Sequence, residues 1–170
     1  MIEEILTTRL KMRPIKLEDA ITLNYEIDKD LTKYWIGWEP SNNVGELREK
    51  IKSSIEKSRR GLNLDLSAFE RKSNQFIGCC GISKTDFKDY EINVWVRHSS
   101  QNKGYAKEMV RAIIKWTKEN TELSYLIYSV TQGNKASEHI AQELQAVPFR
   151  TWDAKKRGKN LTVQDYKVII

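Results

Sequence analysis

Residues from which proteins build disulfide and metal sites are scarce in this sequence of 170 residues. Its two cysteines, Cys79 and Cys80, are neighbours, so on a strand they point to opposite faces, and a disulfide between them would be strained. Free thiols are typical of a reducing compartment, and a core-filling role is favoured over a redox or nucleophilic one. The two histidines, His98 and His139, complete no metal-ligand spacing, so we expect no metal site.

Long apolar runs are absent as well. No segment approaches the ~20 apolar residues that a membrane-spanning helix needs. The first residues, Met1 to Ile5, lack the basic and long apolar segments of a signal peptide. The fingerprints of P-loop proteins, zinc proteases and dinucleotide-binding proteins are missing too. We therefore expect no membrane association, a cytoplasmic location and one domain that spans residues 1–170.

Basic residues outnumber acidic ones. With 29 Lys and Arg against 23 Asp and Glu, the net charge is +6, which suits either a polyanionic cofactor or nucleic acid. Basic residues gather at Arg59-Arg60 and in the segment Lys155–Lys159. We interpret the second cluster as a solvated hairpin turn. The alternative is that it binds RNA or a phosphate of the cofactor.

The spacing of apolar residues predicts alternating strands and helices. A mixed α/β or α+β domain is therefore expected. The segment 31–43, which contains Trp35, Trp38 and Pro40, has no clear period. The predicted strands are 6–13, 62–70, 75–83, 90–97 and 125–130 with a closing hairpin of 149–154 and 161–170, and the predicted helices are 17–30, 44–59, 106–117 and 134–145.

The loop Gln101-Asn102-Lys103-Gly104-Tyr105-Ala106 falls between a strong strand pattern and a strong helix pattern. At such a place several backbone N–H groups lack intrahelical partners and point along a favourable dipole, so an anion can bind. Gly104 and Ala106 have little or no side chain to hold a pyrophosphate away from these amides, and Lys103 adds a positive charge. The alternative is that Gly104 only relaxes a turn.

The loop resembles the acyl-CoA-binding motif of the GNAT superfamily of N-acetyltransferases, in which Gln or Arg is followed after two residues by Gly and after one more by Gly or Ala. Three further segments are similar, in order, to the branch that acetylates ribosomal-protein N-termini. They are Thr8–Pro14 with Leu17–Ala20, Glu91–Val96, and the Asn-x-x-Ser motif Asn134–Ser137. The resemblance covers residues 6–170 and implies a GNAT-like domain, with a mixed, mostly antiparallel sheet flanked by about four helices.

The implied reaction is direct acetyl transfer from acetyl-CoA to a primary amine. An α-amino group has a pKa of about 8 and a lysine one of about 10, so the amine must first lose a proton. A general base within hydrogen-bond reach assists this step. Glu91 is the first candidate because it matches the family's strand glutamate and lies opposite Ile92 and Val94. The alternative is an ordinary solvated glutamate.

The resemblance also implies the cofactor contacts. Backbone amides around Trp95 and Val96 would run along the pantetheine and polarise the thioester carbonyl. Asn134 would bind the pantetheine, although a helix N-cap explains it equally well. Ser137 would lie near the sulfur as a candidate acid. The full implied cofactor-binding set is Trp95, Val96, Gln101, Asn102, Lys103, Gly104, Tyr105, Ala106, Asn134 and Ser137.

The sequence departs from the family in two places. Many relatives carry a tyrosine farther along the last helix, but the segment Ile140–Gln142 supplies none, which leaves Ser137 or water to protonate the thiolate. Where relatives have Leu-Gly-Phe, the segment Leu144–Phe149 reads Leu-Gln-Ala-Val-Pro-Phe, so we expect a reshaped helix exit.

Substrate choice is expected in the first two helices and their connection. Asp28, Asp30 and Glu39 are candidates to attract an ammonium group, and Trp35 or Trp38 to stack on it, although core packing is favoured for the tryptophans. The resemblance favours a protein N-terminus, including a ribosomal one. Polyamines, aminoglycoside-like antibiotics and other small amines stay open.

Two partner expectations complete the sequence-based hypothesis. Relatives often form homodimers, and nucleic acid is expected only indirectly, through a ribosomal substrate. The alternative function is a noncatalytic GNAT-like module that binds RNA or a protein partner through its basic surface.

Overall fold

The computed structural model describes residues 4–41 and 43–170, which form one eight-stranded sheet, four α-helices and a short 3₁₀ helix. Residues 1–3, at the start of the segment inspected for a signal peptide, and residue 42 lie outside this part. The elements are β1 (Ile5–Leu6), β2 (Leu10–Pro14), α1 (Asp19–Glu26), α2 (Val44–Arg59), β3 (Asn63–Glu70), β4 (Phe76–Lys84), β5 (Tyr90–Val96), η1 (His98–Ser100), α3 (Tyr105–Asn120), β6 (Tyr125–Thr131), α4 (Lys135–Glu143), β7 (Val147–Lys156) and β8 (Lys159–Ile169).

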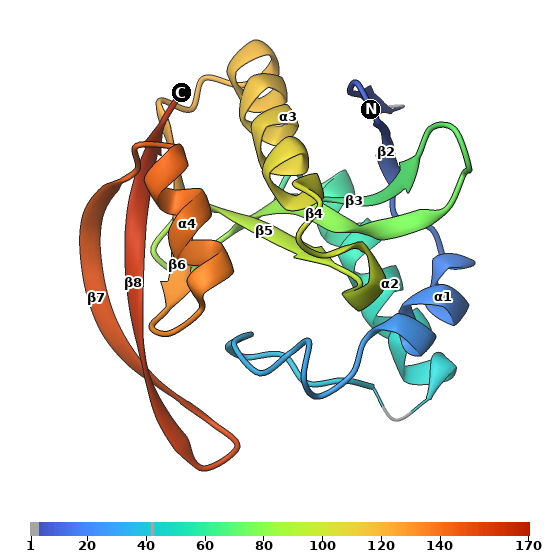
Figure 1. Ribbon diagram of the computed structural model, residues 1–170, viewed down its shortest axis with the longest axis horizontal. Helices are drawn as coiled ribbons and strands as arrows, with labels where there is room; N and C mark the ends of the chain where they lie inside the picture. Colours follow the sequence, from blue (N-terminus) through green and yellow to red (C-terminus); the bar gives the residue numbers. More distant parts are fainter. Residues whose placement is uncertain (1–3, 42) are drawn as a thin grey trace.

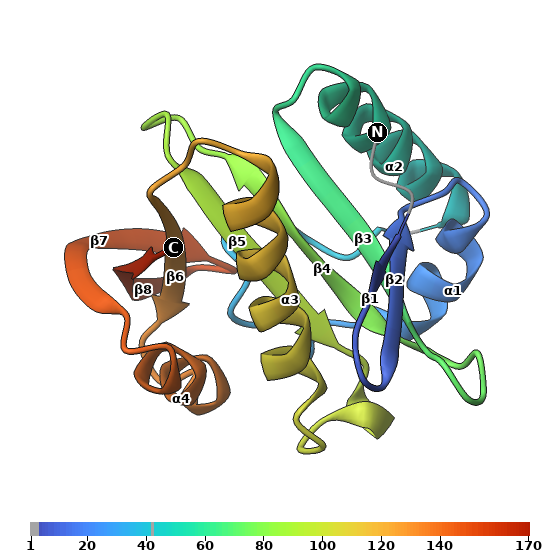
Figure 2. The ribbon, with the colours of Figure 1, turned by 90° about the horizontal axis from the view of Figure 1, so that it is seen from above.

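The sheet has the strand order β1-β2-β3-β4-β5-β6-β8-β7 (Figures 1 and 2). Every neighbouring pair is antiparallel except β5 with β6, which is parallel. This confirms the expected fold class, a mixed, mostly antiparallel sheet flanked by four helices. Within the described residues, no helix has both the length and the apolar character to cross a membrane.

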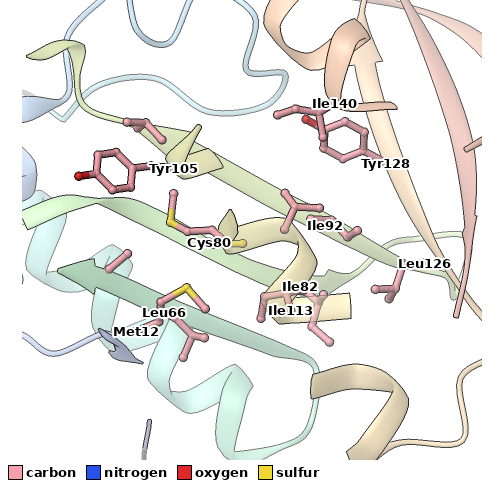
Figure 3. Close-up of a cluster of buried hydrophobic side chains, with 14 of the residues drawn as sticks. Met12, Leu66, Cys80, Ile82, Ile92, Tyr105, Ile113, Leu126, Tyr128 and Ile140 are labelled. Carbon is pink, nitrogen blue, oxygen red and sulfur yellow. The ribbon is translucent and has the colours of Figure 1, made fainter. Parts of the chain in front are cut away.

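Two apolar cores lie on the two faces of the sheet, because side chains of a strand alternate between its faces. Ile92 and Val96 of β5 belong to the core under α3 and α4. Figure 3 shows part of this core. Trp95, between them, packs against the second core, which includes Leu23 of α1 and Leu47 of α2. The faces of β5 therefore look toward different pairs of helices.

Two predicted elements differ most from the structure. The strand predicted at 6–13 is a hairpin, in which Ile5 pairs with Met12. The Thr7 hydroxyl closes its turn by accepting a hydrogen bond from Leu10 N at 2.9 Å. The helix predicted at 17–30 ends at Glu26, because Ile27 is extended with φ −95° and ψ 113°. Neither turn interrupts the apolar spacing, so periodicity did not predict them.

The parallel pair β5–β6 determines where a ligand can enter. Its register joins Glu91 to Ile127, and no other residue pair of the two strands is paired within the described chain. Beyond Glu91 the strands separate, and the last residues of β5 face Tyr128 of β6 across a cleft. Separated strands leave room for an extended molecule along the free edge of β5.

Candidate active site

A cleft of about 580 Å³ lies between the separated ends of β5 and β6. Its walls come from β5, the loop before α3, β6, the start of α4 and the connection between α1 and α2. Lys103 and Glu91 are outside its lining. The predicted cofactor-binding residues that line the cleft are Trp95, Val96, Gln101, Asn102, Gly104, Tyr105, Ala106, Asn134 and Ser137.

Gly104 gives the predicted anion-binding loop the backbone conformation that starts α3. It is the N-cap residue with φ +78°, in the left-handed region where glycine has no Cβ penalty. The first intrahelical bond at this end runs from Glu108 N to Gly104 O at 3.2 Å, and no side chain of the described residues caps the helix. The amides of Tyr105, Ala106 and Lys107 therefore remain available to an anion, as a pyrophosphate site requires.

Two side chains fix the loop to neighbouring backbone. Gln101 Nε2 donates to Val96 O at 3.1 Å, which joins the loop to the end of β5. Lys103 Nζ donates to Ser99 O at 2.9 Å, so its charge lies beside η1 and away from the cleft lining. Gln101 thus has a structural role in addition to its position on the cleft.

Arg9 holds the loop before α3 in place from the β1–β2 hairpin, a role that sequence reasoning missed. Its Nη1 donates to Lys103 O at 2.9 Å, and its Nε lies 2.6 Å from Glu108 Oε2. The guanidinium stacks 4.4 Å above the ring of Tyr105, whose hydroxyl donates to Glu70 Oε1 at 2.8 Å. The β1–β2 hairpin and the end of β3 therefore hold the start of α3. Arg9 lies within the segment Thr8–Pro14 that carries part of the resemblance, but nothing in its local pattern indicates this contact.

Asn134 and Ser137 meet at the start of α4. The Asn134 Oδ1 accepts a hydrogen bond from Ser137 N at 3.3 Å, which confirms the N-cap interpretation of Asn134. Both residues also line the cleft, so the cap does not exclude a ligand contact. Gly133, with φ +88°, precedes them in the tight turn from β6.

Glu91 lies at the vertex where β5 and β6 are still paired. The side chain is partly buried, and this burial raises the pKa of its carboxyl above the ordinary 4.5, while the neighbouring Ser129 hydroxyl partly offsets the rise. Asp165 raises this pKa further and Arg150 lowers it. The interpretation of Glu91 as an ordinary solvated glutamate is therefore not what the structure shows.

Asp165 forms a buried polar cluster on the same side of the sheet as Glu91. It is 1% exposed and accepts hydrogen bonds from Arg150 Nε at 2.8 Å and Trp152 Nε1 at 3.0 Å. Asp165 pairs with Ser129 in the β6–β8 register, so the side chain of Asp165 lies beside that of Ser129, the residue that Glu91 faces. Sequence reasoning missed this cluster because its members come together only when β6, β7 and β8 pair.

The α1–α2 connection closes one end of the cleft. Tyr34 and Trp35 line it, and Tyr34 Oη donates to Gly133 O at 3.1 Å beside the start of α4. The ring of Trp35 lies 5.1 Å from that of Trp38 and 5.8 Å from that of Trp95. The three tryptophans therefore form an aromatic cluster next to the cleft, rather than separate core anchors.

The basic cluster at residues 155–159 forms the predicted β7–β8 hairpin turn, but two of its cations do more than face solvent. Lys156 is 6% exposed, donates to Trp35 O at 2.5 Å and to Trp38 O, and lies 3.0 Å from Glu39 Oε1. Arg157, with φ +50°, pairs with the same carboxylate at 2.6 Å. Two cations of the cluster thus hold the α1–α2 connection, and the prediction of a solvated turn was wrong for them.

The three acids predicted to attract an ammonium group each have a basic partner in the structure, and Asp30 is the one of the three that lines the cleft. The pairs are Asp28 with His98 at 3.2 Å, Asp30 with Lys33 at 3.1 Å and Glu39 with Arg157 at 2.6 Å.

Comparison with known proteins gives this geometry a family. The acetyltransferase (GNAT) domain matches residues 9–147. The uncharacterized N-acetyltransferase p20 of Bacillus licheniformis is 27% identical over 146 residues, which cover 84% of this chain and 82% of that protein. Both matches include the loop before α3 and the start of α4.

Two solved structures share the fold. The ribosomal L7/L12 alpha-N-protein acetyltransferase RimL, in complex with coenzyme A, has a TM-score of 0.87 at 20% identity and covers 99% of this chain and 98% of its own. The spermidine N-acetyltransferase of Vibrio cholerae, in complex with CoA and spermine, has a TM-score of 0.82 at 15% identity, with 96% of each chain covered.

In the described residues 4–41 and 43–170, no group of three or more His, Cys, Asp or Glu side chains is placed to hold a metal ion. The match to the acetyltransferase domain extends over far more than half of the 170 residues, and the cleft has the open strand edge and the exposed helix amides described above. The chain belongs to the GNAT acetyltransferase family.

Proposed function

We propose that this protein transfers an acetyl group directly from acetyl-CoA to a primary amine. The observation that carries the proposal is one cleft that joins the free amides at the start of α3 to the separated strands β5 and β6. A partly buried carboxylate, Glu91, lies at the vertex of that separation. An anion site, an extended groove and a candidate base follow one another, as acyl transfer from a phosphate-bearing thioester requires.

The described residues fit acetyl-CoA in two parts. The amides of Tyr105, Ala106 and Lys107 would hold the pyrophosphate. The free edge of β5 at Trp95 and Val96 would hydrogen-bond the pantetheine as a neighbouring strand does. Acetyl-CoA supplies the activated acyl group, and the protein supplies position and charge.

Glu91 is the proposed general base. Burial raises the pKa of its carboxyl, so the carboxylate is a stronger base than an exposed glutamate. It points to the face of the sheet that carries Ser129 and Asp165. An amine would therefore approach from this face, on the other side of the sheet from Ile92 and Val94. Ser137 is the proposed acid at the cofactor side.

The acceptor proposed is the α-amine of a protein N-terminus, with a small amine as the alternative. The RimL structure belongs to an enzyme named for ribosomal L7/L12, and the Vibrio cholerae enzyme is named for spermidine. A protein N-terminus and spermidine both carry a primary amine at the end of a chain. A cytoplasmic location, for which the free thiols Cys79 and Cys80 give support, and a homodimer are parts of the same proposal.

The test measures release of the CoA thiol when the purified chain is mixed with acetyl-CoA and one of three amines. The amines are a short peptide with a free N-terminus, the same peptide with a blocked N-terminus and an internal lysine, and spermidine. The proposal expects turnover with the free N-terminus and a product that is heavier by one acetyl group. Turnover with spermidine alone would show that the acceptor is a small amine and not a protein N-terminus. No turnover with any of the amines would overturn the catalytic proposal.

A further inference from the structure

A buried phenol in the cleft wall has no hydrogen-bond partner among residues 4–41 and 43–170. Tyr128 of β6 is 3% exposed, and its hydroxyl oxygen is fully covered yet unpaired among the described residues. The neighbouring Ser137 hydroxyl lowers the pKa of the phenol, but the two hydroxyls do not reach hydrogen-bond geometry. Buried hydroxyls are nearly always paired, because an unpaired one destabilises the fold. An orphaned hydroxyl in a ligand cleft therefore indicates a missing partner.

The position of Tyr128 shows which side the partner must come from. Figure 3 shows its hydroxyl turned away from β6, toward Ile140 of α4. Tyr128, Ser137 and Ile140 all line the cleft. Burial raises the pKa of Tyr128 to about 12, so the phenol keeps its proton and stays a donor throughout the physiological range.

Tyr128 is also at the level of the candidate base. It follows Ile127, the residue that pairs with Glu91, and so points to the other face of the sheet. Glu91 faces Ser129 and Asp165, whereas Tyr128 packs in the core under α3 and α4. The carboxylate and the phenol thus flank the opening between β5 and β6 from its two faces.

We propose that Tyr128 is a catalytic residue that donates a hydrogen bond to the sulfur of the leaving thiolate. The inference rests on the proposed acetyl transfer and deepens it. It gives the leaving thiolate a hydrogen-bond donor from β6. The segment Ile140–Gln142 of α4, in contrast, supplies no tyrosine. Tyr128 and Gly104 line the same cleft, so a cofactor held by the amides at the start of α3 would occupy the cavity that the phenol lines.

The phenol of Tyr128 keeps its proton throughout the proposed acetyl transfer. The nitrogen lone pair forms the C–N bond, and the amine proton goes to Glu91. The C–S bond breaks and its electron pair goes to sulfur, which departs as a thiolate. An ordinary thiol has a pKa of about 8.5, well below that of Tyr128, so the phenol stabilises the sulfur charge by a hydrogen bond, and Ser137 or water protonates the thiolate afterwards.

The first test compares Tyr128→Phe with wild type. We expect kcat to fall roughly 10- to 100-fold, the rate equivalent of one hydrogen bond to a charged group, with the KM for acetyl-CoA changed less than about threefold. The free variant should unfold at the same or a higher temperature than wild type, because it loses an unpaired hydroxyl. Tyr166→Phe is the matched control, since Tyr166 pairs with Tyr128 across β6 and β8 but does not line the cleft.

The second test needs no turnover. At pH 9, where much of a free thiol is ionised, wild type should bind CoA about tenfold more tightly than desulfo-CoA, and Tyr128→Phe should bind the two within about twofold. Unchanged kcat and unchanged discrimination in Tyr128→Phe would overturn the inference while acetyl transfer stands. If wild type discriminates the two ligands but acetylates no amine, the proposed function fails and the contact between Tyr128 and sulfur stands.

Discussion

Arg157 at the tip of the β7–β8 hairpin binds Glu39 in the α1–α2 connection. Its Nη2 and Nε donate to Glu39 Oε2 at 2.6 and 2.9 Å, and Nη2 also donates to Thr32 Oγ1 at 2.9 Å. Lys156, the preceding residue, donates to the carbonyls of Trp35 and Trp38. The hairpin tip therefore fixes the segment that places Trp35 on the cleft.

Lys156→Met tests this role of the hairpin tip. The change leaves buried carbonyls unpaired, so we expect the free energy of unfolding to fall by about 1–3 kcal/mol. The KM for the amine should rise while acetyl-CoA affinity stays the same, because the altered segment lies on the acceptor side. Lys155→Met, at an exposed neighbouring position, is the control and should change neither quantity. Equal effects of both variants would show that charge, not the buried contact, matters.

Glu91→Gln tests the proposed base. We expect kcat/KM to fall about 100- to 10,000-fold, the usual range for loss of a general base. In wild type, activity should be lost as pH falls through the raised pKa of Glu91, because only the carboxylate accepts a proton. This acidic limb should disappear in the variant, so that only the ionisation of the amine substrate still makes the rate depend on pH.

Ser129→Ala supplies the matched variant for the pH profile. The Ser129 hydroxyl lowers the pKa of Glu91, so its removal should move the acidic limb of kcat/KM to higher pH. The rate at pH values above the limb should stay near that of wild type. A limb that stays in place in Ser129→Ala, or that persists in Glu91→Gln, assigns the base role to water or to another group.

Asp19→Asn tests the ion pair that anchors α1. Asp19 is 7% exposed, and its carboxylate accepts hydrogen bonds from Arg13 Nη2 at 2.7 Å and Ser67 Oγ at 2.8 Å. Burial raises the pKa of this carboxyl, but the hydrogen bonds outweigh it and the pKa is lowered below 3.8. We expect the variant to lose about 3 kcal/mol in free energy of unfolding at pH 7.

The sign of the pH dependence follows from the lowered pKa. Stability from ionised Asp19 is present above 3.8 and is lost as pH falls through the folded-state pKa, so wild type and variant should converge in acid. Asp30→Asn, in a surface pair, should lose less than about 1 kcal/mol. A constant difference between wild type and Asp19→Asn across this range would contradict the ion-pair account.

Local signals were sufficient for much of the fold. The helix predicted at 44–59 has those bounds in the structure, and the strand predicted at 90–97 ends one residue earlier, at Val96, because each has an uninterrupted apolar period. The glycine loop was found from the same kind of signal, since a strand pattern, Gly104 and a helix pattern follow one another. Thr7 and Ile27 produced errors, because a side-chain hydrogen bond or a single extended residue changes no apolar spacing.

Contacts between distant segments explain what the sequence did not predict. Lys156 is buried by carbonyls about 120 residues away in the chain, and nothing next to it indicates them. Tyr128 occupies an apolar position in the alternation of β6, so it looks like any core aromatic until its unpaired hydroxyl is seen. The raised pKa of Glu91 likewise depends in part on the charge of Asp165 in another strand.

The central claim is that acetyl-CoA binds in the cleft that starts at Gly104, and a calorimetric titration of acetyl-CoA tests it most directly. Wild type should bind one equivalent, and Gly104→Trp should lose binding because the ring would cover the amides at the start of α3. Gly61→Trp is the control for backbone strain, since Gly61 has φ +69° and open space around its Cβ position. The account predicts binding by wild type and Gly61→Trp only; no heat with wild type, or equal binding by a folded Gly104→Trp, would contradict it.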